Sequence, residues 1–551
     1  MCQHRRVAHF QRAESLANLS TVEYDVVVIG AGMTGAGVAL DAASRGLRVA
    51  LLDAGDIASG TSSKSSKMVH GGLRYLQQKE FRLVYENLRE RQRLLENAPF
   101  LVRPLPFLIP LFGKDGTVSK ALVKGYATAL RIYDLTGGWR IGARYRRITR
   151  DEALSHLPTL RTQQLVAGFI YMDARGDDAR VALTLARSAA LDFGADVATY
   201  LRVTGLSRDE KGRVCEVVAH DRLGECEIRV RTRSVVNASG VWADHVFNMV
   251  EHAASHEITP AKGVHVTVPR HRLPADVAAV LTVPGDRRSI FVVPFEEAPY
   301  TFIGTTDTAY DGPLDQPECS AHDVAYLLNA VNAWTSSDLR SEDVTGVWAG
   351  LRPLLAPKQG KSMSERTADL SRRHKVTDSH DGVIHITGGK WTTYRQMAED
   401  GVDALKPYFA RLASARTKNL RLHGTSAWRP QGELEQHLYH RFGSESQVIL
   451  DLVRNDPTLG ETVIEGLPFV GAEFVYSARH EMATSLVDLL TRRTRAHLHN
   501  ARATLAAAPK VARLVAEDLG WDEDQIDSQL RAYETLVASE FTAAGLSVER
   551  S

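Results

Sequence analysis

Short apolar runs that end at glycine occur at three places far apart in the chain. Residues 25–29, 235–238 and 382–387 each form such a run, and a glycine follows within two positions. Residues 35–45 follow the first run with alanine-rich helical spacing, and residues 47–52 are typical of a second buried strand. This order predicts a β-α-β unit within an α/β sheet that is assembled from separate segments.

The rest of the chain shows two further patterns. Helical spacing in residues 179–193 is followed by alternating runs at 214–219 and 227–230, which predict an antiparallel meander. Proline-punctuated, strand-rich segments interrupt the α/β pattern, and helical spacing dominates from about residue 405. We expect a flexible lead-in at 1–22, an α/β domain from 23–95, 168–250 and 345–404, an inserted β-rich substrate domain from 96–167 and 251–344, and a helical C-terminal domain at 405–551. Within the last, helical spacing is clearest at 447–453, 483–490 and 525–537.

Composition narrows the classes of function. The 67 basic and 66 acidic side chains give a formal net charge of +1, so nothing global favours nucleic acid as a partner. The four cysteines form no CxxC pair, so we expect no metal site, no disulfide framework and a reducing compartment. The sequence shows no signal peptide and no apolar run of spanning length, which predicts a cytoplasmic protein that is at most attached to a membrane surface.

A glycine loop follows the first predicted strand. Gly30 permits a tight turn, Gly32 allows the backbone to approach a pyrophosphate, and Gly35 lets the next helix pack closely on the strand. The N-terminus of that helix directs amide donors at the anion. Asp53 ends the second strand at the offset of a ribose-binding acid, with a helix cap as its alternative role. We therefore predict a Rossmann-like domain that binds an ADP moiety through Gly30, Gly32, Met33, Thr34, Gly35 and Asp53.

The segment after this acid distinguishes FAD from NAD. Residues 60–67 form a run of serine, threonine and lysine, and a Gly-Gly pair follows at 71 and 72. Such a run is often only a flexible loop, but its place directly after the acidic strand end favours a loop that wraps a flavin. We expect FAD as the cofactor, with further contacts at Thr61, Ser62, Ser65, Ser66, Gly71 and Gly72.

Seven motifs occur in order between residues 30 and 395. They are residues 30–37, residues 60–76, Asn-Ala-Ser-Gly-Val-Trp-Ala at 237–243, Lys-Gly-Val-His at 262–265, Ile-Gly-Thr-Thr-Asp at 303–307, Gly-Leu-Arg-Pro-Leu at 350–354 and Gly-Gly-Lys-Trp-Thr-Thr-Tyr-Arg at 388–395. With this series the chain resembles the FAD-dependent, respiratory glycerol-3-phosphate dehydrogenases, within the D-amino-acid-oxidase-like flavoproteins. The residues after 405 are similar to the extra C-terminal domain of that family. Two residues depart from its pattern: Asp53 stands where Glu is more common, which puts its grip on the ribose in question, and Trp391 replaces a smaller apolar residue.

The resemblance implies oxidation of sn-glycerol 3-phosphate to dihydroxyacetone phosphate, with hydride passing from C2 to the flavin. A phosphate dianion requires cations, and the planar fork of arginine suits it well. The family places residues matching Arg74, Tyr75, Arg352, Arg372 and Lys390 near the substrate. We assign Arg352 and Arg372 mainly to binding, and Arg74 and Tyr75 to positioning on the phosphate or flavin side.

The proton of the C2 hydroxyl must also be removed, which requires an acceptor within hydrogen-bond reach. His265 is the first candidate and His70 the second, because imidazole titrates near neutral pH. Lys390 would stabilise charge on the reduced flavin, and we group it and Arg352 with these histidines as catalytic residues. The remaining expected contacts with FAD are Val203, Gly240, Trp242, Gly389, Lys390, Thr392 and Thr393, of which the two threonines begin a helix.

The resemblance also implies a membrane quinone as the electron acceptor. Residues 100–112 are apolar, and residues 119–133 and 139–150 mix apolar with basic side chains. Together they predict a peripheral contact with the inner face of the cell membrane, with a buried strand and an ordinary amphipathic helix as the alternative. A glycerol-3-phosphate oxidase that uses oxygen would share the same motifs, and a non-catalytic flavoprotein scaffold is a third interpretation. The sequence leaves a homodimer open.

Overall fold

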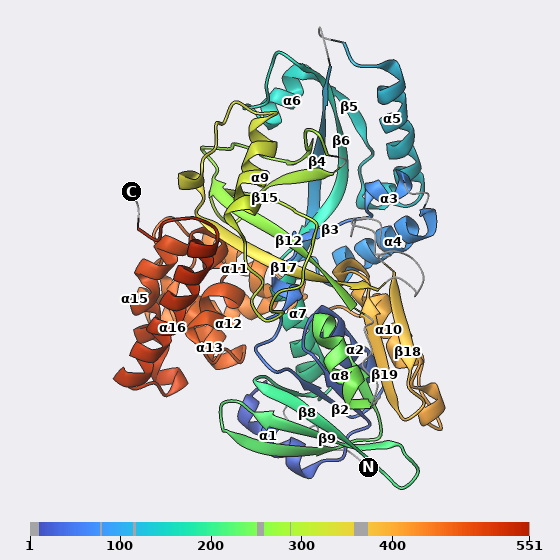
Figure 1. The fold of residues 1–551 in the computed structure, drawn as a ribbon. Coiled ribbons are helices and arrows are strands. Elements are labelled where there is room, and N and C mark those ends of the chain that lie inside the picture. Colours follow the sequence, from blue (N-terminus) through green and yellow to red (C-terminus); the bar gives the residue numbers. More distant parts are fainter. Residues whose placement is uncertain are drawn as a thin grey trace.

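Three β-sheets, of six, three and ten strands, and a group of C-terminal helices make up the described part of the protein (Figure 1). The computed structural model describes residues 10–77, 80–113, 117–250, 258–286, 288–356 and 373–549. The six-stranded sheet lies at one end of the molecule, the ten-stranded sheet at the other, and the C-terminal helices lie at one side. This arrangement confirms the predicted α/β class, with a Rossmann-like domain, a β-rich domain and a helical C-terminal region.

The six-stranded sheet is assembled from segments far apart in the sequence. Its strands are β1 (Val26–Ile29), β2 (Val49–Leu52), β7 (Asp196–Ala198), β11 (Val235–Asn237), β18 (His374–Asp378) and β19 (Val383–Gly388). Their order is β18-β19-β11-β1-β2-β7, in which only β18 is antiparallel to its neighbour. All four residues of β1 and of β2 are buried, as expected when both faces of a parallel sheet are covered.

Alternating side chains of β1 serve two cores. Val26 and Val28 pack with α2 (Met33–Ser44), α7 (Asp178–Arg187) and α10 (Tyr394–Asp403) on one face of the sheet. Val27 and Ile29 face the opposite side, because successive side chains of a strand point in opposite directions. The helix predicted at 179–193 forms as α7 and the π-helix η3 (Ser188–Asp192).

The second face is covered by the predicted meander and by α1. The meander consists of β8 (Leu201–Arg208), β9 (Val214–Asp221) and β10 (Cys226–Arg231). The expectation of a flexible lead-in at 1–22 is wrong for residues 12–21, which form α1 (Arg12–Thr21). Leu19 of this helix is buried against the meander core, and Arg12 forms an ion pair with Asp221. Packing of Leu19 and the ion pair of Arg12 therefore stabilise this helix. The few apolar residues in this segment did not predict it.

The ten-stranded sheet forms the β-rich domain. Its members are β3 (Met68–Val69), β4 (Val102–Phe112), β5 (Arg146–Thr149), β6 (Leu165–Gly176), β12 (Ile258–Pro269), β13 (Ala278–Thr282), β14 (Ser289–Pro294), β15 (Tyr300–Gly304), β16 (Thr308–Ala309) and β17 (Gly346–Leu355). The expected domain boundaries at 167 and 344 assigned most of β6 and all of β17 to the α/β domain. Both strands instead belong to the ten-stranded sheet. β17 pairs with β12 along its whole length and β6 with β4, so long ladders draw both strands away from the cofactor domain.

The C-terminal helices are α11 (Glu433–Phe442), α12 (Ser446–Asn455), α13 (Gly471–His480), α14 (Ala496–His499), α15 (Ala501–Leu519) and α16 (Glu523–Ala543). The helix expected at 483–490 is wrong for its first residues. The carboxylate of Asp488 accepts bonds from the amides of Thr484 and Ser485, the helical turn begins at residue 486, and the π-helix η12 continues it from Asp488. Among the described helices, none combines the length and the apolar character needed to cross a bilayer.

Candidate active site

A cavity of about 1170 Å³ lies where the carboxyl ends of the parallel strands face the ten-stranded sheet. Ile29, Leu52, Ala238 and Gly388, which end or follow β1, β2, β11 and β19, line its cofactor side. Residues of β12 and β17 line the opposite side. Ligands of open α/β sheets bind outside the carboxyl ends of the strands, so this cavity is the candidate site.

The glycine loop forms the tight corner between β1 and α2. Gly30 has φ +102°, and a Cβ at this position would lie 2.8 Å from the carbonyl oxygen of Ala238. A Cβ on Gly35 would overlap the carbonyl oxygen of Gly30, so only glycine allows α2 to start this close to the strand. The N-terminal turn of α2 therefore faces the cavity, and Gly30, Gly32, Met33 and Thr34 line it.

Asp53 joins two loops of the site. Its Oδ2 accepts a bond of 2.6 Å from the amide of Ala31, and its Oδ1 accepts one of 2.9 Å from the amide of Gly55. Burial raises the pKa of Asp53 to about 6 although both amides oppose this shift. The shortened acid thus braces the glycine loop from within, in addition to the ribose contact expected from the sequence.

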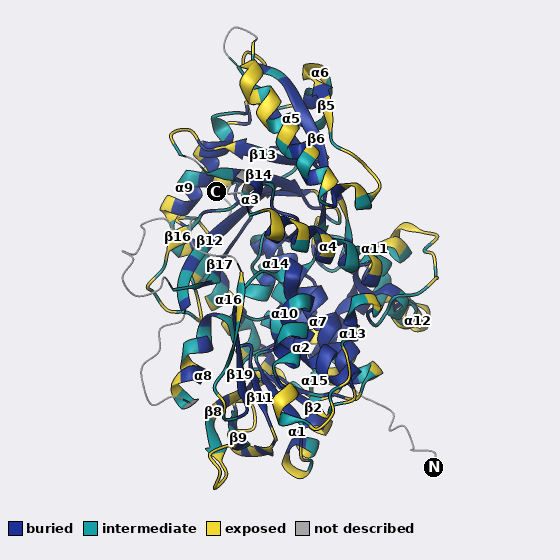
Figure 2. Ribbon diagram, turned by 90° about the vertical axis from the view of Figure 1, so that its right-hand side faces the viewer, coloured by how far each residue is buried: buried dark blue, intermediate teal, exposed yellow. Residues whose placement is uncertain are grey.

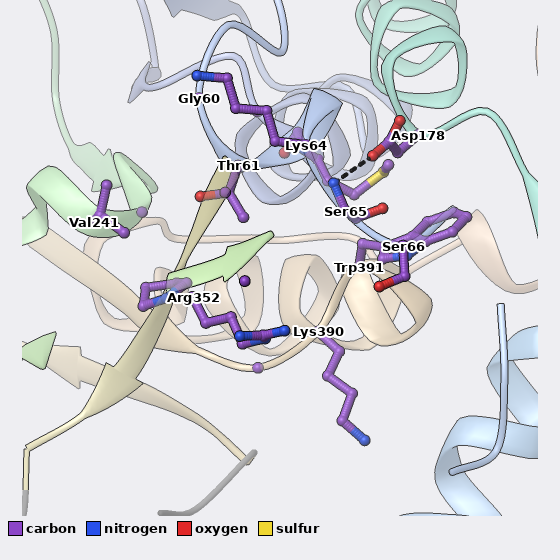
Figure 3. Close-up of a pocket in the computed structure, with 18 of the residues that line it drawn as sticks. Gly60, Thr61, Lys64, Ser65, Ser66, Asp178, Val241, Arg352, Lys390 and Trp391 are labelled. Carbon is purple, nitrogen blue, oxygen red and sulfur yellow. Dashed lines mark hydrogen bonds between the residues drawn. The ribbon is translucent and has the colours of Figure 1, made fainter. Parts of the chain in front are cut away.

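The serine-rich loop, residues 60–67, lies directly against the glycine loop and also lines the cavity. Ser62 Oγ accepts a bond of 2.8 Å from the amide of Met33, and Thr61 Oγ1 donates one of 2.6 Å to the carbonyl oxygen of Leu351. The amide of Ser65 donates to Asp178 at 2.9 Å, the interaction drawn in Figure 3. The loop is therefore tied to α2, to β17 and to α7 at once.

His265 lies on β12 at the floor of the substrate side. It is 2% exposed, and its ring stacks on Trp348 with centroids 4.7 Å apart and an interplanar angle of 8°. Its Nε2 lies 2.7 Å from Ser66 Oγ. A Cβ on Gly304 of the neighbouring strand would overlap the ring, so the absence of that side chain makes room for it.

Burial lowers the pKa of His265 well below its ordinary value, and the positive charges of Lys67 and Arg352 act in the same direction. The imidazole is therefore neutral at physiological pH and has one unprotonated ring nitrogen. Its Nδ1 is buried and has no hydrogen-bond partner in the part of the chain that the structure describes. His70 lines the same cavity.

Two cations face the cavity near His265. Arg352 on β17 donates through Nη1 to Asp307 at 3.3 Å and through Nη2 to Thr305 at 3.2 Å. The ammonium of Lys390 lies 3.7 Å from the centroid of the Tyr75 ring. Figure 3 shows Arg352 and Lys390 at one side of the cavity, with the serine-rich loop at the other. Arginine, lysine and a neutral imidazole thus meet in one site, a set suited to a phosphorylated alcohol.

The other expected residues divide into two groups. Ser65, Ser66, Gly72, Val203, Gly240, Trp242, Gly389 and Thr392 also line the cavity. Gly35, Gly71 and Thr393 are not among its lining residues. The amide of Gly71 instead donates to the Tyr133 hydroxyl at 2.8 Å. The Thr393 hydroxyl donates to the Lys390 carbonyl oxygen at 3.1 Å. Both residues therefore support cavity-lining segments without lining the cavity themselves. Arg74 belongs to α3 (Leu73–Gln77) with its side chain undescribed, and Arg372 lies outside the described residues.

Several lining residues had no role in the sequence analysis. Lys64, Asp178, Arg288, Thr305 and Asp307 all line the cavity. Thr305 and Asp307 lie within the motif at residues 303–307. A hydroxyl and a carboxylate in that motif could have indicated partners for the guanidinium of Arg352. Asp178 begins a helix far from any glycine motif, so nothing in the sequence indicated its contact with the serine-rich loop.

Comparison with known proteins identifies the family. A family model described as FAD dependent oxidoreductase matches residues 25–395, and one described as the C-terminal domain of alpha-glycerophosphate oxidase matches residues 385–526. The chain is 40% identical over 547 residues to glycerol-3-phosphate dehydrogenase 2 of Mycobacterium tuberculosis, covering 96% of this chain and 91% of that protein. The chain belongs to the glycerol-3-phosphate dehydrogenase family.

Other members of the glycerol-3-phosphate dehydrogenase family show the same extent of similarity. The human mitochondrial enzyme is 34% identical over 551 residues, covering 94% of this chain and 74% of that one. The crystal structure of the Bacillus halodurans glycerol-3-phosphate dehydrogenase complexed with FAD superposes with a TM-score of 0.77 at 28% identity, over 99% of both chains. The resemblance inferred from the seven motifs is confirmed.

The residues present fit FAD, the cofactor of this family. Gly30 and Gly35 leave no space for a side chain, which keeps the turn tight and α2 close to β1, and Gly32 between them is the position at which the backbone would approach a pyrophosphate. The helix that follows directs its N-terminus at the cavity, which favours an anion. His265 and Lys390 line the same cavity of about 1170 Å³, so it extends beyond the residues of the glycine loop.

Proposed function

We propose that the protein oxidises sn-glycerol 3-phosphate to dihydroxyacetone phosphate. The observation that supports this most directly is the juxtaposition of a neutral, buried His265 with the cations Arg352 and Lys390 in one cavity beside the glycine loop. FAD, when bound, supplies the two-electron acceptor. The substrate class follows from the family's members, whose names specify this compound.

His265 accepts the proton of the C2 hydroxyl in this proposal. Its neutral state leaves a ring nitrogen able to act as a base, and the stacking on Trp348 fixes the plane of the ring. Ser66 Oγ, 2.7 Å from Nε2, orients the ring or passes the proton on.

Arg352 binds the phosphate group of the substrate. Asp307, Thr305 and the carbonyl oxygen of Thr306 hold its guanidinium at the wall of the cavity. Lys390, packed on the ring of Tyr75, adds a second positive charge. Arg74 and Arg372 remain proposals from the sequence for the same role.

The test is formation of dihydroxyacetone phosphate from sn-glycerol 3-phosphate by the purified, FAD-loaded protein, with an artificial electron acceptor. We expect turnover with this substrate and at least about tenfold less with glycerol, since glycerol has no group for Arg352 to bind. Equal turnover of both compounds would exclude a phosphate-binding site, and no turnover of either would leave the non-catalytic flavoprotein as the better interpretation.

We infer that the electron acceptor is a quinone. The same cavity has an apolar arm, lined by Phe107, Ile109 and Phe112 of β4, Phe291 of β14 and Tyr126 of α5 (Lys120–Leu135). Such a lining suits an aromatic, water-insoluble acceptor better than it suits a charged one. Turnover with a soluble quinone should exceed peroxide formation in air. The opposite ratio would favour the glycerol-3-phosphate oxidase.

A peripheral membrane contact would bring this apolar arm to its acceptor. Five of the seven large apolar side chains exposed in the described part of the chain lie between residues 81 and 139, namely Phe81, Tyr85, Leu122, Leu135 and Trp139. Figure 2 shows the exposed outer side of α5 in this region. A groove of about 660 Å³ beside it is lined by Arg131, Arg144, Arg146 and Arg147. Apolar residues flanked by arginines are typical of surface contact with anionic lipid.

One part of the membrane prediction is wrong. Residues 100–112 do not contribute, because β4 runs between β13 and β6 in the ten-stranded sheet and its residues Leu105, Phe107, Leu108 and Leu111 are buried. Co-sedimentation with anionic vesicles at low salt tests the contact of the remaining segments, with zwitterionic vesicles as the control. Absence of binding to the anionic vesicles would contradict the proposal. A homodimer stays a prediction, and analytical ultracentrifugation of the purified protein would test it.

A further inference from the structure

Three arginines of the C-terminal region, the half-buried Arg492 and the buried Arg493 and Arg495, reach the loops of the FAD-binding domain. Arg492 Nε lies 2.6 Å from Asp56 Oδ2, and Arg493 lies 2.7 and 2.8 Å from the two oxygens of the same carboxylate. Asp56 is 1% exposed and follows β2 three positions after Asp53. The segment around η12 (Asp488–Arg493) therefore holds the loop that contains the ribose-binding candidate.

Arg495 holds the serine-rich loop in the same way. Its Nη2 lies 2.6 Å from the carbonyl oxygen of Ser63 and 3.0 Å from Asp178 Oδ1. The other oxygen of Asp178 accepts the amide of Ser65 at 2.9 Å. Arg495 is 2% exposed and has a left-handed backbone conformation with φ +71°, so the surrounding structure fixes its position closely.

Residues at and next to these anchors face the cavity. Ser62, Ser65 and Ser66 line it, and Ser66 is also the partner of His265. The only regular structure in this loop is the three-residue helix η1 (Thr61–Ser63). Hydrogen bonds within the loop, such as that from the Lys67 amide to Ser65 Oγ, are supplemented by contacts from outside it, and Arg495 supplies a charged contact from the C-terminal region.

We propose that Arg495 is a positioning residue for FAD. It fixes residues 62–66 in the conformation that binds the cofactor, so the C-terminal helical region is required for tight retention of FAD. The proposal rests on FAD binding by this family and not on the identity of the substrate.

The test compares the FAD affinity of Arg495→Gln with that of a matched control, Arg479→Gln. Arg479 is exposed and pairs with Asp518 inside the C-terminal region, so its loss removes an arginine without touching the serine-rich loop. We expect the dissociation constant of FAD, measured on apo-protein by flavin fluorescence, to rise by about 10- to 100-fold in Arg495→Gln, the effect of losing charge-assisted hydrogen bonds. The control should stay within about twofold, the effect of an exposed pair.

Two further measurements separate positioning from general loss of structure. Hydrogen exchange of the apo-protein should become faster in peptides covering residues 60–67 of Arg495→Gln, while peptides covering β1 and α2 keep their rates. Arg495→Lys retains the charge without the fork and should give an intermediate affinity, which also decides the matter if Arg495→Gln does not fold. Affinity for FAD equal to that of the parent, in a folded Arg495→Gln or in Arg495→Lys, would overturn the proposal. Failure of sn-glycerol 3-phosphate to react would not affect it, because no substrate is used.

Discussion

His265 Nε2 lies 2.7 Å from Ser66 Oγ, although 199 positions separate the two residues in the chain. The contact joins β12 of the ten-stranded sheet to the serine-rich loop of the FAD-binding domain. The proposed proton acceptor is thus oriented by the same loop that faces the cofactor. Under the proposed roles, binding of FAD and deprotonation of the substrate would both depend on this loop.

Replacing His265 should abolish proton abstraction without removing the cofactor. In His265→Asn we expect kcat to fall by about 100- to 10,000-fold, the usual contribution of a general base, while FAD content is unchanged. The control is His220→Gln, an exposed histidine on β9 outside the cavity. Steady-state kinetics, with the flavin content of each variant measured in parallel, test this expectation. A kcat within threefold of the parent would direct attention to His70.

Replacing Arg352 should weaken substrate binding more than catalysis. Arg352→Lys keeps the charge but loses the planar fork that Asp307 and Thr305 hold. We expect KM for sn-glycerol 3-phosphate to rise by about 10- to 100-fold, with a smaller decrease in kcat. Arg340→Lys, on the surface, should leave both constants unchanged. An unchanged KM in Arg352→Lys would place the phosphate elsewhere.

His423 should make stability depend on pH. Its Nδ1 lies 3.0 Å from Asp192, and together with Glu445 this carboxylate raises the pKa of His423 to about 9. A raised histidine pKa stabilises the folded state below its unfolded value of 6.5, and that contribution is lost as pH rises through 9. The free energy of unfolding should therefore decrease by up to about 3 kcal/mol between these values.

Urea denaturation at a series of pH values measures the contribution of His423. In His423→Gln the decrease between pH 6.5 and pH 9 should be smaller than in the parent, because the group that releases the proton is absent. An identical pH dependence in the two proteins would contradict the role assigned to His423.

Gly35 should tolerate no side chain. A Cβ at this position overlaps the carbonyl oxygen of Gly30, so Gly35→Ala has to move α2 away from β1. We expect loss of FAD binding and a destabilisation of roughly 1–3 kcal/mol in chemical denaturation, as for other overpacked sites. Gly125→Ala, in α5 with open space around it, should instead be neutral or slightly stabilising. Equal stability of the two variants would contradict the packing described.

The parts of the site that the sequence predicted are those fixed by local geometry. A strand, a glycine loop and a helix in direct succession constrain the backbone within a few residues, so the roles of Gly30 and Gly35 and the β-α-β unit were visible without the rest of the chain. The segments 235–238 and 382–387 were assigned to the same sheet for a similar reason, since each is a buried run that ends at glycine.

The contacts that the sequence did not predict depend on long-range packing. The pairing of β12 with β15 and β17 sets Gly304 and Trp348 around His265, and no local pattern specifies that register. Asp178 and Arg495 reach the serine-rich loop from two other regions of the chain. The lead-in at 12–21 became a helix through contacts with β7 and β10, which are equally remote in sequence.

Anaerobic addition of sn-glycerol 3-phosphate to the FAD-loaded protein tests the central claim most directly. About one equivalent of substrate should bleach the oxidised flavin absorption within the dead time of manual mixing, and the same addition to His265→Asn should bleach it at least about 100-fold more slowly. An absorption spectrum that stays unchanged after addition of substrate, in protein whose flavin is still bleached by dithionite, would contradict the assignment of this site to the oxidation of sn-glycerol 3-phosphate.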